Sequence, residues 1–174
     1  SEEERIEEDI RRHIKRTRDR LDELRRRLEE DIKRLRERVE DLKRDLERNI
    51  RELRDRLRRG RLSEKVVRDS REKLERLREE MEREVKESRD RLREVKEEIE
   101  DLIRRNKEKL DRLRERGLPE EILRRMERLT RELAKDADRL LKKYRKLTED
   151  LKRELEKILK TYRDLTEELK ERSR

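Results

Sequence analysis

The chain contains the three residue types that form hydrolytic triads: one histidine, His13, together with serines such as Ser88 and carboxylates such as Asp31. In a triad the histidine takes the serine proton and the carboxylate orients the histidine, which requires contacts of about 3 Å. His13 and Asp31 lie eighteen residues apart on one expected helix, a separation of about 27 Å at ~1.5 Å per residue. We therefore expect no triad and predict that the protein is not an enzyme.

Metal and phosphate chemistry is equally poorly supported. The chain has no cysteine and a single histidine, so a zinc site would lack a second nitrogen or sulfur ligand. Asp31 has no inward-facing acidic neighbour that would make a carboxylate pair. Gly60 and Gly117 are the two glycines, so no glycine-rich loop could cradle a phosphate. We expect no metal and no cofactor.

The spacing of the apolar residues indicates long helices. Charged residues make up 64% of the chain and hydrophobic ones 27%, a composition typical of disordered proteins. From Ile6 to Leu57, however, the apolar residues recur at spacings of three and four, with one skip at Thr17. This is the pattern of one helix face, and a disordered polyampholyte has no reason to keep it.

Capping signals divide the chain into three such helices. Ser1 and Glu4 form an S-x-x-E capping box, Gly60 suits the left-handed position after a helix end, and Ser63 suits the next N-cap. Gly117 repeats the stop signal, and Pro119 suits a first helical position, although the N-cap would then be a leucine and the boundary uncertain by one residue. The expected helices cover about 2–59, 63–116 and 119–172. Connections this short predict antiparallel neighbours.

A repeat of eighteen residues runs through the chain. "YRKLTEDLK" begins at Tyr144 and "YRDLTEELK" at Tyr162. Eighteen residues are a whole number of helical turns, so such a pattern needs no supercoil. Polar and aromatic residues follow the same spacing in four columns: His13, Asp31 and Asn49; Ser70, Ser88 and Asn106; Thr130, Thr148 and Thr166, beside Leu129, Leu147 and Leu165; and Met126, Tyr144 and Tyr162.

These columns predict polar levels in the core. Partners in antiparallel helices have residue numbers with a constant sum, and the predicted turns at Gly60 and Gly117 match the sums that the columns give. Grouping polar residues from three helices lets them satisfy one another's hydrogen bonds, although the members from the first helix could instead face water. The predicted levels are His13, Asn106 and Thr130, near Met126; Asp31, Ser88 and Thr148, near Tyr144; and Asn49, Ser70 and Thr166, near Tyr162.

Binding functions have weaker support. The net charge of +9 and the pI of about 9.8 permit non-specific electrostatic binding to nucleic acid, but the surplus is spread evenly over the three helices. A lipid-surface module would use similar amphipathic helices, but the chain has no Trp or Phe and a narrow apolar stripe. No apolar run is long enough to span a membrane, and the acidic start is unlike a targeting signal. We expect a soluble protein of undetermined localisation.

The pattern as a whole resembles de novo designed, parametric three-helix bundles of the untwisted kind with an 18-residue layer repeat. The likeness is carried by the four columns, the two near-copies, the loops "RRGRLSEK" and "ERGLPEEI", and the surface of Arg, Lys, Glu and Asp. The resemblance implies a stable monomer with idealised geometry and no natural partner.

The sequence thus predicts an all-α protein, an antiparallel and nearly straight three-helix bundle of helices of about 55 residues each. Residues 1–174 would form one elongated domain. Its expected role is that of a structural scaffold, or a test of bundle design, in which the polar levels fix the register. The alternative is a non-specific module that binds nucleic acid or lipid surfaces.

Overall fold

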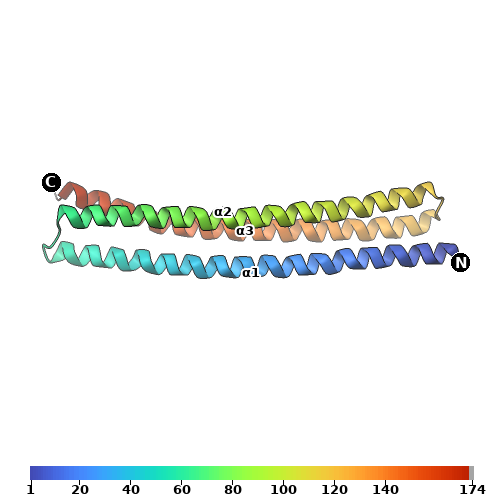
Figure 1. The fold of residues 1–174 in the computed structure, drawn as a ribbon, viewed down its shortest axis with the longest axis horizontal. Helices are drawn as coiled ribbons and strands as arrows, with labels where there is room; N and C mark the ends of the chain where they lie inside the picture. Colours follow the sequence, from blue (N-terminus) through green and yellow to red (C-terminus); the bar gives the residue numbers. More distant parts are fainter. Residues whose placement is uncertain (173–174) are drawn as a thin grey trace. The chain divides into compact units, whose positions relative to one another are not determined.

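The computed structural model describes residues 1–172 and is all-α (Figure 1). Three long helices pack as a bundle: α1 (Glu2–Arg58), α2 (Glu64–Glu115) and α3 (Glu120–Arg172). Each boundary lies within one residue of its predicted position, and the predicted fold class is confirmed. The near-straight geometry of the bundle stays a prediction.

Serine hydroxyls cap the first two helices. Ser1 Oγ accepts a hydrogen bond from the Glu4 backbone N–H at 3.3 Å, and Ser63 Oγ accepts one from the Val66 N–H at 3.3 Å. Each bond satisfies one of the amides that a helix start leaves without an intrahelical partner. Both predicted N-caps are confirmed.

Glycines in the left-handed region end the first two helices. Gly60 has φ 64° and Gly117 has φ 78°, a conformation that costs a residue without a Cβ little. The chain then folds back, so that the Arg61 N–H bonds to the Arg56 carbonyl at 2.9 Å. This closure satisfies carbonyls at the helix end, and both predicted stops are confirmed.

The start of α3 differs by one residue from the predicted one. The Leu123 N–H donates to the Pro119 carbonyl at 3.2 Å, and α3 begins at Glu120. Pro119 therefore holds the N-cap position rather than the first helical position. Proline has no backbone N–H, so its carbonyl can open the helix while the ring leaves no further donor to satisfy.

The contacts divide the chain into two compact units, each built from parts of all three helices. The first unit contains Ser1–Glu30 and Asp90–Arg145, and the second contains Asp31–Arg89 and the chain from Lys146 onward. In the first unit the N-terminus and the α2–α3 connection lie at one end; in the second, the α1–α2 connection and the last turns of α3 do (Figure 1). Neighbouring helices consecutive in sequence are thus antiparallel within each unit.

The core of each unit is a set of leucines, isoleucines and valines on the inner helix faces. In the first unit Leu24, Ile99 and Leu133 are at most 2% exposed, and in the second unit Leu46 and Leu155 are 1% exposed. No large hydrophobic side chain is exposed in the part of the chain that is described. Hydrophobic burial of this kind is the main favourable term in folding.

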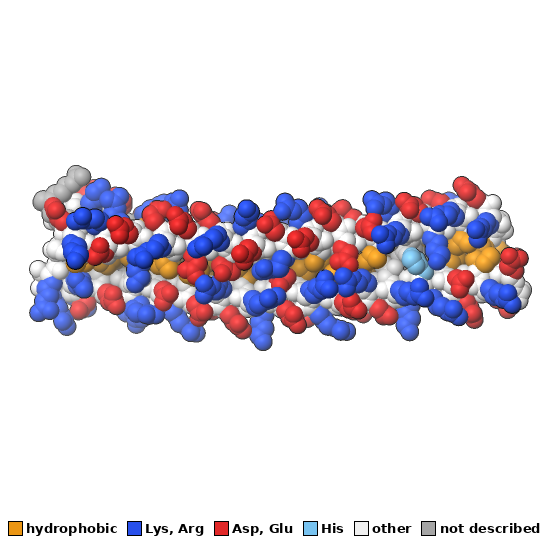
Figure 2. All heavy atoms as spheres, viewed as in Figure 1, with side chains coloured by type: hydrophobic (Ala, Val, Ile, Leu, Met, Phe, Trp, Pro, Cys, Tyr) orange, Lys and Arg blue, Asp and Glu red, His pale blue; other side chains and the backbone are white. Residues whose placement is uncertain are grey.

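The outer faces are covered by charges of both signs. Figure 2 shows Lys and Arg side chains intermingled with Asp and Glu along the visible face, and neither sign gathers into a patch. Many pairs lie three or four residues apart on one helix, such as Arg11 with Glu7 at 3.0 Å and Arg48 with Asp45 at 2.8 Å. Exposed pairs of this type stabilise a helix by only about 0.2–0.5 kcal/mol each.

Candidate functional site: the buried polar side chains

The polar residues that the columns single out are mostly buried. Asp31 is at the margin of burial with 9% exposure, and His13 and Ser70 are half-buried. The other members are at most 5% exposed: Asn49, Ser88, Asn106, Thr130, Thr148, Thr166, Tyr144 and Tyr162. The alternative that the α1 members simply face water is therefore wrong for Asn49, which is 5% exposed.

In the first unit the polar contact between helices joins Asn106 of α2 to Thr17 of α1. The Asn106 Nδ2 donates to Thr17 Oγ1 at 3.2 Å, and Thr17 Oγ1 lies 3.3 Å from Asn106 Oδ1. Thr17 Oγ1 also lies 3.0 Å from the His13 carbonyl, to which it donates along its own helix. Both side chains are at most 3% exposed, so the Asn106 amide is satisfied in an otherwise apolar interior.

His13 lies beside this pair at the edge of the core. Partial burial lowers the pKa of His13 below its ordinary 6.5, and the positive charges of Lys109, Arg16 and Arg105 lower it further. A side-chain hydrogen bond with Asn106 opposes this shift. His13 thus belongs to the same polar group as Asn106, in surroundings that favour the neutral imidazole.

Most hydroxyls bond to their own helix rather than across the core. Thr130 Oγ1 donates to the Met126 carbonyl at 3.0 Å, Thr166 Oγ1 to the Arg163 carbonyl at 2.8 Å, and Ser70 Oγ to the Val66 carbonyl at 2.8 Å. The expectation that each level would satisfy itself across three helices is wrong for these hydroxyls. A short hydroxyl reaches a carbonyl one turn back more easily than a side chain on a neighbouring helix.

The level of Asp31, Ser88 and Thr148 lies in the second unit, whereas Tyr144 belongs to the first. The Asp31 carboxylate accepts a hydrogen bond from Arg34 at 2.6 Å, in an ion pair three residues along the same helix. Ser88 and Thr148 are buried at 5% and 3% exposure. Asp31 thus lies at the rim of the core and pairs with a residue of its own helix.

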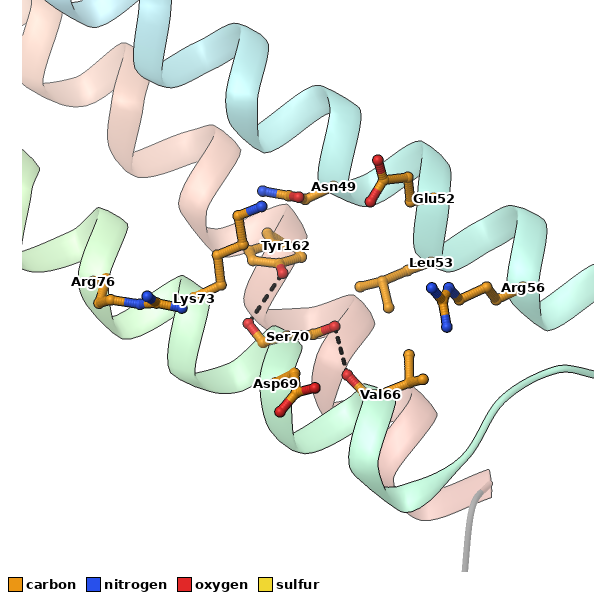
Figure 3. A pocket seen from close by; sticks show the side chains of 10 residues that line it. All are labelled: Asn49, Glu52, Leu53, Arg56, Val66, Asp69, Ser70, Lys73, Arg76 and Tyr162. Carbon is orange, nitrogen blue, oxygen red and sulfur yellow. Dashed lines mark hydrogen bonds between the residues drawn. The ribbon is translucent and has the colours of Figure 1, made fainter.

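At the level of Asn49 one polar group has no partner. Asn49 Nδ2 is buried and makes no hydrogen bond in the described structure, although its side chain is 5% exposed. Nearby, the Tyr162 hydroxyl of α3 donates to the Ser70 carbonyl of α2 at 3.0 Å (Figure 3). Burial raises the pKa of Tyr162 above 10.0, the Ser70 hydrogen bond opposes this, and the charge of Glu52 raises it further.

Helix α3 presents its threonines rather than the neighbouring leucines to the core. Thr130, Thr148 and Thr166 are at most 3% exposed, whereas the column of Leu129, Leu147 and Leu165 is half-buried. The apolar column therefore covers the edge of the core. Each threonine carries a methyl group, and Thr130 and Thr166 bond their hydroxyls to their own helix, so these two can occupy the centre at little cost.

Sequence reasoning missed two sets of residues that join the helices. Thr17 interrupts the apolar stripe, and that interruption is a signal in itself, because a buried polar residue needs a partner. Arginines and lysines also pair across helices: Arg20 with Glu98 at 2.6 Å, Lys43 with Glu154 at 2.7 Å, and Arg89 with Glu149 at 2.7 Å. Because most surface positions are charged, no sequence pattern distinguishes the residues that pair across helices from the others.

The contacts that these groups make in the described structure are hydrogen bonds and a local ion pair. Within residues 1–172, no group of three or more His, Cys, Asp or Glu side chains could hold a metal ion. The same described residues include no helix with a stretch apolar enough to cross a membrane. His13 belongs to the first unit and Asp31 to the second.

Comparison with known proteins points to the architecture. No protein-family model matches the chain, and no curated protein matches it. A solved structure described as a computationally designed three-helix bundle aligns with a TM-score of 0.57 at 16% identity, covering 99% of this chain and 84% of that one. At this identity the likeness shows the fold, and the chain is a three-helix bundle similar to a designed one.

Proposed function

We propose that the protein is a designed structural scaffold whose buried polar side chains hold its helices in one register. On this proposal it catalyses no natural reaction, needs no cofactor or partner, and is a monomer built on an eighteen-residue repeat. The likeness to a computationally designed bundle supports the architectural part of the proposal. A scaffold needs one defined arrangement of its helices, and polar core groups can supply that definition at a cost in stability.

The observation that carries the proposal is the bond between Asn106 and Thr17. Both side chains are at most 3% exposed, and each is a polar residue in an otherwise apolar stripe. Sliding α2 along α1 by one turn would place the Asn106 amide against leucine or isoleucine. A buried amide without a partner costs about 1–3 kcal/mol, enough to disfavour the shifted register by about fivefold or more.

Ion pairs between α1 and α2 support the same register. Arg20 pairs with Glu98 in the first unit, and Arg38 pairs with Glu80 in the second. Arg20 and Arg38 are eighteen residues apart, and so are Glu98 and Glu80. Between α2 and α3 the second unit repeats the arrangement, with Arg89–Glu149 at 2.7 Å and Arg71–Glu167 at 3.6 Å.

The register can be tested by replacing Ser70, Ser88 and Asn106 together with leucine. Spin labels at the exposed positions Asp19 and Lys107 would report the offset of α1 and α2 in the first unit. We expect one sharp distance in the parent and additional distances or oligomers in the triple variant, since one turn of sliding moves a helix by about 5.4 Å. Circular dichroism should show unchanged helix content.

The matched control replaces Thr130 and Thr166 with valine. These hydroxyls donate to carbonyls of their own helix, so their removal should leave a single label distance. A triple leucine variant that remains a monomer with the parent distance distribution would show that the polar groups do not define the register.

Non-specific electrostatic binding is the competing proposal. It predicts binding to nucleic acid that falls steeply with salt, or binding to anionic vesicles. The intermingled charges of the visible face give neither ligand a continuous positive surface (Figure 2). Retention of duplex DNA or of vesicles at physiological salt would favour this function over the scaffold.

A further inference from the structure

A pocket of about 370 Å³ opens in the second unit beside Asn49, whose amide nitrogen has no hydrogen-bond partner (Figure 3). Asn49 and Leu53 line it from α1, Val66 and Ser70 from α2, and Tyr162 from α3. Leu53 and Tyr162 are at most 3% exposed, so these two lining residues also belong to the core of the unit. Its volume lies in the range of small-molecule sites.

The polar groups of this pocket have an uneven hydrogen-bonding capacity. The Ser70 hydroxyl proton is committed to the Val66 carbonyl at 2.8 Å, and the Tyr162 hydroxyl proton to the Ser70 carbonyl at 3.0 Å. Both oxygens can therefore only accept a further hydrogen bond. Asn49 Nδ2 is the opposite case, a buried donor without an acceptor. Asn49 lines the pocket, and rotation about its broad terminal torsion would bring Nδ2 to a ligand there.

We propose that this pocket is a binding site for a small neutral carboxamide or urea group attached to a compact apolar body. Such a group carries a carbonyl acceptor beside N–H donors. Its carbonyl would accept from Asn49 Nδ2, and its N–H groups would donate to the Ser70 and Tyr162 oxygens. The apolar body would pack against the walls that Leu53 and Val66 provide.

Charged side chains of both signs surround these polar groups. Lys73 points from α2 toward Asn49 in Figure 3 and makes no ion pair in the described structure, so it adds a second donor near the amide. Arg56 and Arg76 also line the pocket, together with Glu52 and Asp69. A carboxylate ligand is disfavoured by the Ser70 and Tyr162 oxygens, because it has no N–H to donate to them.

Benzamide is the probe we would use, and side-chain amide NMR the readout. The chain has no glutamine, so Asn49 and Asn106 supply its two side-chain carboxamides. Because Asn106 is already bonded to Thr17 in the first unit, its signal is an internal control. We expect millimolar benzamide to shift the Asn49 signal and leave the Asn106 signal in place, and benzoate of the same shape to shift it several-fold less at equal concentration.

Three variants sharpen the experiment. Asn49→Leu should weaken benzamide binding about tenfold, as expected for the loss of one hydrogen bond, while Ser70→Ala should weaken it several-fold and spare the Tyr162 bond to the Ser70 backbone. Asn106→Leu, which lies in the other unit, should leave binding unchanged. Binding in the Asn49→Leu variant can be followed by the Tyr162 ring signals.

The proposal is overturned by any of three results. One is the absence of a shift at Asn49 over the millimolar range of benzamide. Another is benzoate binding as tightly as benzamide, which would make the pocket a simple cationic site. The third is unchanged benzamide affinity in a folded Asn49→Leu variant.

Discussion

The two asparagines of the chain are buried in different units and differ in hydrogen bonding, since one amide nitrogen has a partner and the other has none. Asn106 in the first unit bonds to Thr17 across two helices, at 3.2 Å from its amide nitrogen. Asn49 in the second unit has an amide nitrogen that is buried without a partner. Burial is nearly the same for both, 2% and 5% exposed. The difference is whether a side chain of the facing helix can accept a hydrogen bond from the amide.

The eighteen-residue spacing shows which residues the second unit has at the positions that correspond to Thr17 and Asn106. Two repeats after Thr17 the stripe carries Leu53, and two repeats before Asn106 it carries Ser70. The second unit therefore replaces a hydroxyl with an isobutyl group and an amide with a short hydroxyl that already bonds to its own helix. A buried polar residue is stabilised only when the position facing it is polar and long enough to reach.

The largest loss of stability is expected from replacing core leucines, which are buried in both units. Leu28 and Leu46 are eighteen residues apart on α1, one in each unit, and are 3% and 1% exposed. Each change to alanine should lower the free energy of unfolding by about 2–5 kcal/mol, through lost burial and the cavity left behind. Urea unfolding followed by circular dichroism measures both. Costs that differ severalfold would show that apolar positions one repeat apart are not equivalent.

The next largest loss of stability is expected from breaking the Thr17–Asn106 bond of the first unit. Thr17→Val removes the hydroxyl that satisfies the Asn106 amide, and should destabilise the protein by about 1–3 kcal/mol. Thr130→Val removes a hydroxyl that bonds to its own helix and should cost clearly less. Equal losses in the two variants, measured by thermal or urea unfolding, would mean that the bond between helices adds nothing.

A change of the opposite sign is expected in the second unit. Asn49→Leu removes a buried donor without a partner and adds apolar surface to the core, so it should raise the free energy of unfolding by about 1 kcal/mol. Asn106→Leu is the matched variant, and we expect it to gain less because it gives up an existing bond. A loss of stability in Asn49→Leu would contradict the unpaired state of that amide.

The smallest expected effect is the pH dependence of stability that His13 of the first unit contributes. Burial lowers the pKa of His13 below 6.5, so between that lowered value and 6.5 the unfolded chain binds more protons than the folded one. The free energy of unfolding should therefore fall as pH drops through this window, and this contribution should level off below the folded pKa. NMR titration of the single imidazole measures that pKa directly.

His13→Asn is the control for this titration, because Asn is the residue two repeats later in the same column. Between about pH 7.5 and about pH 5.5, the variant should lose less stability than the parent. A folded-state pKa above 6.5 would place His13 in water or beside an acid, and would separate it from the Asn106 group.

Much of the fold could be read from the chain because local rules govern it. The spacing of apolar residues predicted the helices, and the serine caps and left-handed glycines predicted their ends to within a residue. Pro119 shows the limit of such rules, since the N-cap and the first helical position differ by one hydrogen bond. The candidate site was less predictable, because a hydroxyl can donate its hydrogen bond either to a carbonyl of its own helix or to a side chain of a neighbouring helix.

The sequence by itself determined the all-α class, the number and ends of the helices, and the polar residues that enter their apolar stripes, because periodicity and capping act over a few residues. Only the tertiary structure decided which of those polar residues have partners. That choice depends on a few ångströms between helices distant in sequence: Thr17 meets Asn106, whereas the Ser70 hydroxyl of α2 bonds to its own helix and leaves Asn49 without a partner.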